Sequence, residues 1–173
     1  MSRIAVIGAG TMGHAIALVY ALGGHQVRLT DSNPDTLARA QGLMEAALAT
    51  LVAGGEAPPD WTGAHLGQAV TRHATLEETV DGAEFIVEAI IETPEAKRAL
   101  FEQLDRLAPA EAIIASNTSQ LDVFPLIPER RHRRAMITHW YTPPYLVDLV
   151  DVIPAPGCDP AALDAVEAEL KAM

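Results

Sequence analysis

The chain has 173 residues, of which 49% are hydrophobic and 20% are charged, a composition typical of one globular domain with a sizeable core. Its formal net charge of −11 excludes a general electrostatic attraction to nucleic acid or to an anionic membrane. The single cysteine, Cys158, excludes an internal disulfide and is expected to be a free thiol, and no Cys/His spacing indicates a metal site.

The chain begins Met1-Ser2-Arg3 and passes directly into an apolar segment, without the basic and then apolar run of an export signal. No apolar run is long enough to span a bilayer. We therefore expect a soluble, cytoplasmic protein without a membrane partner. The only segment with the composition of a flexible loop is the Gly- and Pro-rich stretch 54–63.

Strand-like and helix-like patterns alternate along the chain, which predicts an α/β domain of the doubly wound Rossmann type: a mostly parallel sheet with helices on both faces. The expected strands are the short apolar segments 4–7, 26–30, 69–72, 85–88, 112–115, 135–140 and 149–153. The expected helices are residues 11–22, a helix that opens at Asn33-Pro34, a helix that opens at Thr93-Pro94, and residues 159–172.

Apolar residues at helical spacing predict the buried faces of the two middle helices. The helix after Asn33 is expected to bury Leu37, Ala40, Met44, Leu48 and Leu51. The helix after Thr93 is expected to bury Ala96, Leu100, Leu104 and Leu107.

A G-x-G-x-x-G pattern lies between the first expected strand and the first expected helix, which is the context that dinucleotide binding requires. Gly8 permits a tight turn, Gly10 lets the main chain approach a pyrophosphate, and Gly13 lets the helix pack closely against the strand. The first N–H groups of the helix then face the phosphates. We therefore expect Thr11 and Met12, with the three glycines, to bind the cofactor.

Asp31 ends the second expected strand. A carboxylate at this position accepts hydrogen bonds from the adenosine ribose hydroxyls and repels a 2′-phosphate, and residues 32–35 contain no arginine. NAD is therefore favoured over NADP. In a second interpretation the glycines form a turn in another α/β fold and Asp31 only precedes a helix, but the coincidence of turn, helix and acid favours the dinucleotide site.

Three further segments follow the glycine loop. They read Val-Glu-Ala-Ile-Ile-Glu at 87–92, with Lys97 and Phe-Glu-Gln-Leu-Asp at 101–105; Ala-Ser-Asn-Thr-Ser at 115–119; and His-Trp-Tyr-Thr-Pro-Pro at 139–144, leading to residues 149–153. In this order they resemble the 3-hydroxyacyl-CoA dehydrogenase family, whose wider membership includes L-gulonate 3-dehydrogenase (lambda-crystallin) and L-carnitine dehydrogenase. The resemblance implies that residues 1–173 form an NAD-binding domain, and that the enzyme transfers hydride from C3 of a 3-hydroxyacyl substrate to NAD, a reaction of fatty acid metabolism.

Ligands of a doubly wound sheet bind outside the carboxyl ends of its strands, so Glu92, Ser119 and His139 are expected to line one crevice. The resemblance places Glu92 and Lys97 near the nicotinamide half of the cofactor and gives Ser119 a hydrogen bond to the substrate hydroxyl. Asn117 is a cofactor-binding candidate from its position alone. The alternatives are a surface ion pair between Glu92 and Lys97, and a loop serine that satisfies main-chain groups.

Oxidation of an alcohol by hydride transfer also requires a base for the hydroxyl proton, and histidine suits this task near neutral pH. Of six histidines, His139 is the one at a strand end beside a Pro-Pro loop. The resemblance makes His139 the general base and Asp151 the acid that orients its imidazole.

Two positions depart from the family pattern. The family usually has glutamate where this chain has Asp151, so either the strands approach more closely, or the pair is weakened, or Asp148 replaces it; Asp151 is otherwise an exposed strand residue. Thr142 stands where the family usually has asparagine, and it can still donate one hydrogen bond as a cofactor-binding residue. Trp140 and Tyr141 are expected either to wall the substrate site or to pack in the core.

The substrate class is open between a 3-hydroxyacyl-CoA and a small 3-hydroxy acid. The phosphates of CoA normally bind basic residues, and the acyl-CoA enzymes carry lysines after the second strand, whereas residues 40–70 of this chain contain no Lys or Arg. The basic run 130–134 has no interleaved aromatic residues, so we expect a solvated loop rather than a nucleic-acid site.

The resemblance also implies a helical C-terminal domain that closes over the substrate and supplies most contacts of a homodimer. That domain would follow Met173, so we expect a piece of a longer protein, or one chain of a split enzyme, that binds NAD but turns over poorly alone. The alternative from another class is a catalytically silent NAD-binding or redox-sensing module, which the departures at Asp151 and Thr142 favour.

Overall fold

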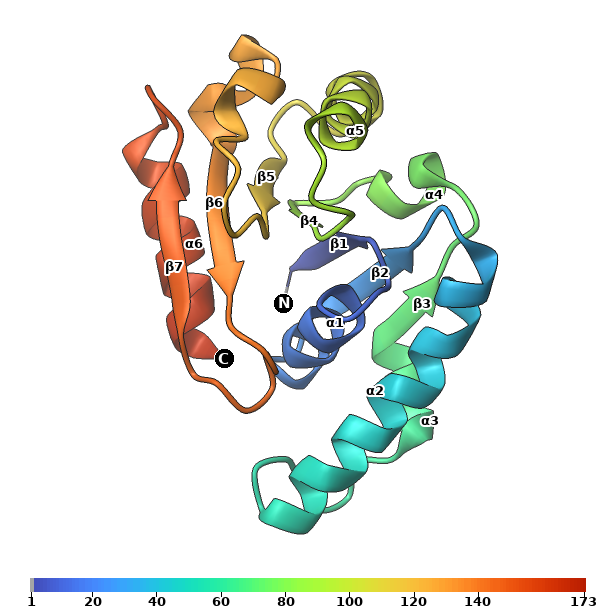
Figure 1. The fold of residues 1–173 in the computed structure, drawn as a ribbon. Helices are drawn as coiled ribbons and strands as arrows, with labels where there is room; N and C mark the ends of the chain where they lie inside the picture. Colours follow the sequence, from blue (N-terminus) through green and yellow to red (C-terminus); the bar gives the residue numbers. More distant parts are fainter. Residues whose placement is uncertain (1) are drawn as a thin grey trace.

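A computed structural model describes residues 2–173, which form a seven-stranded sheet with helices on both faces (Figure 1). The strands are β1 (Arg3–Ile7), β2 (Gln26–Thr30), β3 (Val70–Arg72), β4 (Phe85–Glu88), β5 (Ile113–Ser116), β6 (Ala135–Trp140) and β7 (Val150–Pro154). The α-helices are α1 (Gly13–Leu22), α2 (Pro34–Gly54), α3 (Gly63–Ala69), α4 (Leu76–Val80), α5 (Pro94–Leu107) and α6 (Pro160–Ala172). Two short 3₁₀ helices, η1 (Phe124–Leu126) and η2 (Glu129–Arg134), precede β6.

The strand order is β3-β2-β1-β4-β5-β6-β7, which confirms the predicted doubly wound fold. From β1 the chain passes through α1 to β2 and β3 on one side, and then returns to β4 on the other side. The loops after β1 and β4 therefore leave their strands in opposite directions. In such sheets this reversal opens a crevice at the carboxyl ends of the strands, where ligands bind.

The core consists of two apolar layers, one on each face of the sheet. Successive residues of a strand point to opposite faces, so Ile4 and Val6 of β1 pack with α1, α2 and α6, whereas Ala5 and Ile7 pack with α4 and α5. Figure 1 shows α1 and α5 on opposite sides of the central strands. Because both faces are covered, the central strands are almost continuously apolar.

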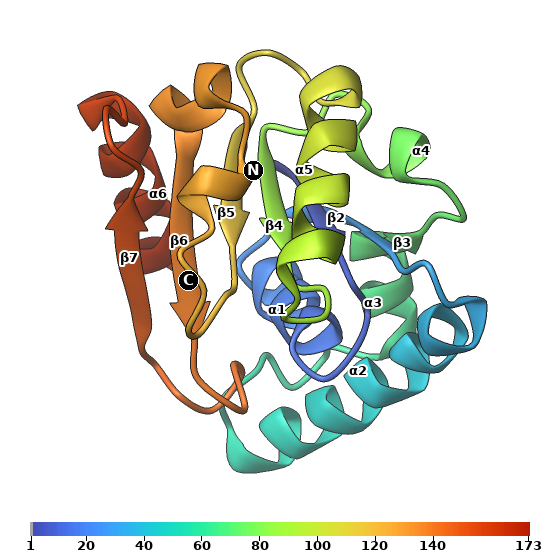
Figure 2. The same ribbon diagram turned by 45° about the horizontal axis from the view of Figure 1, so that its top comes forward.

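The last strand breaks the parallel pattern. β7 pairs with β6 in the antiparallel direction because segment 141–149 returns the chain without a crossover helix. Figures 1 and 2 show these strands side by side at one edge, with α6 packed behind them. The register places His139 directly opposite Asp151, so the two residues expected to form the catalytic pair are cross-strand neighbours.

Most local signals read from the sequence are confirmed. Asn33 caps α2, since its side-chain oxygen accepts hydrogen bonds from the N–H groups of Asp35 and Thr36, and Pro34 is the first helical residue. The helix predicted from Thr11 begins two residues later, at Gly13, with Met12 as its N-cap. The other strand and helix ends fall within a residue or two of the predicted positions.

Two helices were not predicted, and the buried face of α5 was predicted only in part, through Leu100 and Leu104. α3 and α4 are too short to produce a periodic apolar pattern, and α3 follows the Gly- and Pro-rich segment directly. On α5 the expected burial of Leu107 was wrong, because this side chain is 39% exposed. The buried face instead contains Lys97 and Phe101, since the ammonium of Lys97 is neutralised inside the protein.

The basic run 130–134 was expected to be a solvated loop, and this expectation was wrong. It forms η2, and Arg131 is buried, with its guanidinium donating to the carbonyl oxygens of Leu104, Ala108 and Pro109 at the C-terminal end of α5. Arg130 forms an ion pair with Asp105, and the hydrogen bonds from Arg130 and Arg131 lower the pKa of this carboxyl. The cluster therefore closes a helix end.

No helix among residues 2–173 is long and apolar enough to cross a membrane. Cys158 is a half-buried free thiol, as its solitary occurrence predicted.

Candidate functional site

The glycine turn is packed so closely that two of its positions admit no side chain. Gly8 has φ +99°, and a Cβ there would overlap the carbonyl oxygen of Ala89 at the end of β4. A Cβ at Gly13 would overlap the carbonyl oxygen of Gly8. α1 therefore begins in direct contact with the turn, as the glycine pattern predicted.

Gly10, at the crest of the same turn, has the opposite environment. A Cβ added there would have no neighbouring atom within 4 Å, so the main chain is open to an incoming group. The N-terminus of α1 follows directly, and the positive end of a helix dipole attracts anions. The residues present therefore fit the pyrophosphate of a dinucleotide.

Asp31 is held at the end of β2 by main-chain N–H groups. Its Oδ2 atom accepts from Ala9 at 2.7 Å and its Oδ1 atom accepts from Asn33 at 2.8 Å. The first bond ties the acid to the glycine turn, so both parts of the predicted cradle share one rigid corner. The carboxylate retains lone pairs for ribose hydroxyls, the role that its position predicts.

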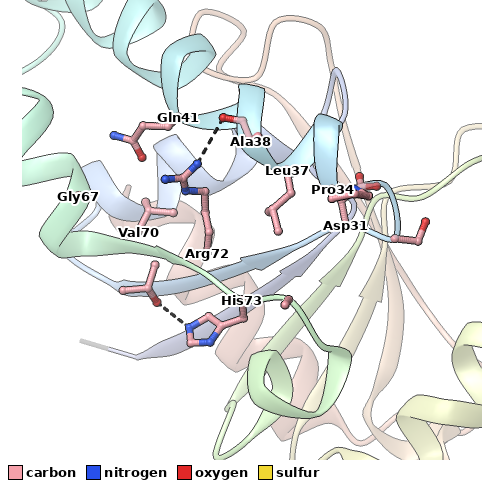
Figure 3. A pocket seen from close by; sticks show the side chains of 12 residues that line it. Asp31, Pro34, Leu37, Ala38, Gln41, Gly67, Val70, Arg72 and His73 are labelled. Atoms are coloured by element: carbon pink, nitrogen blue, oxygen red, sulfur yellow. Dashed lines mark hydrogen bonds between the residues drawn. The ribbon is translucent and has the colours of Figure 1, made fainter.

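A pocket of about 840 Å³ lies beside Asp31, between α2 and β3 (Figure 3). The structure brings Arg72 of β3 into its lining, which the segment 32–35 alone could not reveal. The guanidinium of Arg72 donates to the carbonyl oxygen of Ala38 at 3.3 Å, so part of its hydrogen-bonding capacity is directed at α2.

A buried ion-pair network lies beneath the ends of β4 and β5. Lys97 is 1% exposed, and its Nζ atom is 2.6 Å from Oε1 of Glu88 and 3.1 Å from Oε2 of Glu92. Ser116 donates to the other oxygen of Glu88, which is also fully buried. The alternative interpretation of Glu92 and Lys97 as a surface ion pair therefore does not describe this site.

Glu92 joins the loop after β4 to the loop after β5. Its Oε1 atom accepts hydrogen bonds from the Thr118 hydroxyl and from the N–H of Ser119 at 3.0 Å. Partial burial opposes ionisation of Glu92, but the hydrogen bonds from Thr118, Lys97 and Ser119 and the charge of Lys97 outweigh it and lower its pKa to about 2. Glu92 is therefore a fixed carboxylate that anchors the predicted substrate loop.

Ser119 itself is exposed at the surface of this loop. The hydroxyl that serves the turn is that of Thr118, which accepts from the N–H of Leu121 at 3.1 Å. Asn117 lies beside it, and its Oδ1 atom accepts from the N–H of Trp140 at 2.9 Å. Asn117 thereby fixes the end of β6, where His139 stands, against the end of β5.

The expected contact between His139 and Asp151 is formed. Nδ1 of His139 lies 3.3 Å from Oδ2 of Asp151, so the shorter acid reaches the imidazole, and Asp148 is exposed and not needed. Tyr141 donates to the same Oδ2 atom at 2.8 Å. Hydrogen bonds from Tyr141 and His139 lower the pKa of Asp151, and the bond to Asp151 raises the pKa of Tyr141.

The segment after β6 touches the glycine turn. The hydroxyl of Thr142 lies 3.1 Å from the sulfur of Met12 and donates to it. Two residues separated by most of the chain therefore bring the histidine strand and the nucleotide cradle together. Of the two aromatic candidates, Trp140 is buried in the core and Tyr141 is partly exposed beside His139.

A sequence model of the family described as 3-hydroxyacyl-CoA dehydrogenase, NAD binding domain, matches residues 3–173. The chain belongs to this family.

Relatives within the family act on different substrates. L-carnitine dehydrogenase of Streptomyces griseus is 34% identical over 163 residues, which are 94% of this chain and 47% of that protein. 3-Hydroxyadipyl-CoA dehydrogenase of Escherichia coli is 32% identical over 88% of this chain and 32% of that protein. The solved structure of an NAD⁺-dependent FHMPC 5-dehydrogenase is 28% identical, covers 99% of this chain and 55% of that one, and has a TM-score of 0.87.

The chain is an NAD-binding domain of the 3-hydroxyacyl-CoA dehydrogenase family. It spans about half the length of several curated relatives, among them the lambda-crystallin homologs of Rattus norvegicus and Bos taurus and the L-carnitine dehydrogenase of Streptomyces griseus. The role of each site residue toward cofactor and substrate stays a prediction.

The sequence analysis gave no role to Glu88 and Thr118, and it left Tyr141 between the substrate site and the core. Glu88 is a charged residue at the end of an apolar strand, a signal that could have revealed its buried partner Lys97. Thr118 binds Glu92 of a distant segment, and the bond from Tyr141 to Asp151 depends on the register of β6 and β7, so neither contact could be read from the sequence.

The glycines give a matched pair of substitutions. Gly10→Ala is expected to leave the free energy of unfolding within about 1 kcal/mol of the parent but to weaken NAD binding at least about tenfold, because the methyl group enters the open space above the turn. Gly13→Ala is expected to lower the free energy of unfolding by about 3 kcal/mol, because its methyl group meets a carbonyl oxygen. Urea denaturation and calorimetric titration with NAD measure both effects. Equal losses of stability in the two variants would contradict this account.

The two lysines of the chain give a second matched pair of substitutions. Lys97→Met is expected to lower the free energy of unfolding by about 3–5 kcal/mol, because it leaves two carboxylates without their buried cation. Lys171→Met removes a surface pair with Glu167 and is expected to leave the unfolding midpoint unchanged. Denaturant titrations followed by circular dichroism compare them, and a stable Lys97→Met protein would show that the network is dispensable.

The lowered pKa of Glu92 predicts a pH dependence of stability. Since the folded pKa is about 2 and the ordinary value is 4.5, the ionised Glu92 stabilises the fold fully above about pH 4.5, and this contribution is lost as the pH falls toward 2. Glu92→Gln should therefore lose less stability than the parent between roughly pH 5 and pH 3. Glu95→Gln, on the exposed first turn of α5, serves as the control and should retain the parent's full loss.

Proposed function

We propose that this domain is the nucleotide-binding half of a dehydrogenase that oxidises the C3 hydroxyl of a 3-hydroxy acid or of its CoA thioester. The observation that carries the proposal is the His139–Asp151 pair at the end of β6, beside a segment that contacts the glycine turn through Thr142 and Met12. A candidate base and the glycine turn therefore lie at the same edge of the sheet, where the parallel strands end.

The reaction divides between cofactor and protein. When bound, NAD would supply the acceptor for the hydride of C3, and the protein's task would be to remove the hydroxyl proton. Because the Asp151 carboxylate can only accept a hydrogen bond, the neutral His139 donates through Nδ1 and leaves Nε2 to take the proton. Asp151 then stabilises the imidazolium that forms.

The remaining residues position the reactants. We assign Ser119 to the substrate hydroxyl, because it is exposed on a loop whose main chain is anchored by Glu92. Lys97 is buried and acts through Glu92, and Asn117 acts through the end of β6. The glycine turn, Thr11, Met12 and Asp31 hold the cofactor, with Thr142 closing the turn from the far side.

A free 3-hydroxy acid is the better-supported substrate class. α2 and α3 carry Arg39 as their sole Lys or Arg, so the surface after β2 offers little to the several phosphates of CoA. The similarity to L-carnitine dehydrogenase is consistent with this choice, whereas the similarity to 3-hydroxyadipyl-CoA dehydrogenase keeps the thioester as the competing substrate.

Two measurements test the proposal, NAD binding and NADH formation, because the proposal assigns them to different residues. The chain should bind NAD in calorimetric titrations, and at high enzyme concentration it should form NADH slowly from 3-hydroxybutyrate or 3-hydroxybutyryl-CoA. His139→Gln should lower that rate by about 10²–10⁴-fold, because the base is lost, and should leave NAD affinity unchanged.

An unchanged rate in His139→Gln would remove the histidine from the mechanism. NAD binding without turnover of either substrate, even when the second half of a relative is supplied, would favour the silent NAD-binding or redox-sensing module instead. The departures from the family pattern at Asp151 and Thr142 keep this second function in view.

A further inference from the structure

Tyr141 is the first residue after β6, and it contacts both His139 and Asp151 but has no role in the reaction proposed above. Its hydroxyl donates to Oδ2 of Asp151 at 2.8 Å. Its ring lies against the imidazole of His139, with ring centroids 4.7 Å apart and planes inclined by 53°. The tyrosine therefore reaches over the histidine to the acid on the next strand.

The histidine–aspartate pair is weak by itself. The 3.3 Å separation between Nδ1 and Oδ2 lies beyond the usual range of such bonds, and the side chain of Asp151 is 47% exposed. Exposed ion pairs contribute little, because water and side-chain rotation compete with them. The aspartate is thus free to turn toward solvent unless another group holds it.

The hydroxyl group of Tyr141 fixes the Asp151 carboxylate in this position. At 2.8 Å its bond to Oδ2 has the usual length for a hydroxyl donor and an ionised acceptor, and it is shorter than the bond from His139. The ring also covers one side of the imidazole, which limits the rotation of His139. Among residues 2–173, Asp151 is the charged group that forms an ion pair with His139.

We propose that Tyr141 is a positioning residue that holds the Asp151 carboxylate against Nδ1 of His139, so that the neutral imidazole keeps its proton on Nδ1 and leaves Nε2 bare. This inference rests on the proposed function for its catalytic meaning. The selection of one tautomer of His139 does not depend on the proposed function, because it follows from the contacts of Tyr141 and Asp151. The raised pKa of Tyr141 and the lowered pKa of Asp151, each caused first by the bond between them, agree with it.

The test reads the tautomer directly. Long-range ¹H–¹⁵N spectra of the full chain, taken at a pH where imidazole is neutral, report whether Nδ1 or Nε2 of His139 carries the proton, and His139→Gln assigns the signals among the six histidines. The parent should show a protonated Nδ1 and a bare Nε2. In Tyr141→Phe, which keeps the ring and loses the hydroxyl, the two ¹⁵N shifts should move toward each other as the second tautomer is populated.

Three further proteins separate positioning from a general structural effect. In Asp151→Ala, adding Tyr141→Phe should cause no further change, because the tyrosine has no carboxylate to hold. In Tyr141→Phe with Asp151→Glu, the longer acid should restore the Nδ1-protonated tautomer without the phenol. Tyr145→Phe, on a residue packed in the opposite layer of the core, should leave the spectrum of His139 unchanged.

An unchanged tautomer in Tyr141→Phe would overturn the proposal, as would a second shift of equal size in the Asp151→Ala background. NAD titration of the same proteins keeps the two hypotheses apart. If NAD fails to bind the parent, the proposed function fails while the tautomer result still decides the role of Tyr141.

Discussion

The site depends on one buried cation. The ammonium of Lys97 lies between the carboxylates of Glu88 and Glu92, out of contact with water, and Glu92 in turn anchors the loop that carries Ser119. A buried charge of this kind is tolerated only when it is paired, so the strand ends that supply its partners must stay in place. The loops after β4 and β5 are therefore fixed relative to each other.

A chain of hydrogen bonds extends this rigidity across the mouth of the sheet. Asn117 joins the ends of β5 and β6, and Thr142 joins the segment after β6 to Met12 of the glycine turn. Asp31 closes the other side through its bond to Ala9. Pre-organised groups of this kind lose little freedom when a ligand binds, which suits the alignment of cofactor and hydroxyl group that we propose.

The two departures from the family pattern are each matched by a contact in this chain. Asp151 is shorter than the glutamate usual in the family, but the antiparallel β7 places it directly opposite His139, and Tyr141 supplies a second bond to the same oxygen. Thr142 replaces an asparagine, and its single hydroxyl donates to a sulfur of the glycine turn. Neither substitution leaves its position without a partner.

The sequence alone determined the fold class, the glycine turn, and the positions of Asp31 and His139 near strand ends. These features depend on local signals, namely strand and helix periodicity, the spacing of glycines, and a polar residue at the end of an apolar strand. Only the tertiary structure decided that Lys97 is buried, that Arg131 closes a helix end, and that Asp151 rather than Asp148 reaches His139. These outcomes depend on which strand lies beside which and in what register. Such pairings join residues far apart in the chain, and no local pattern encodes the distance between them.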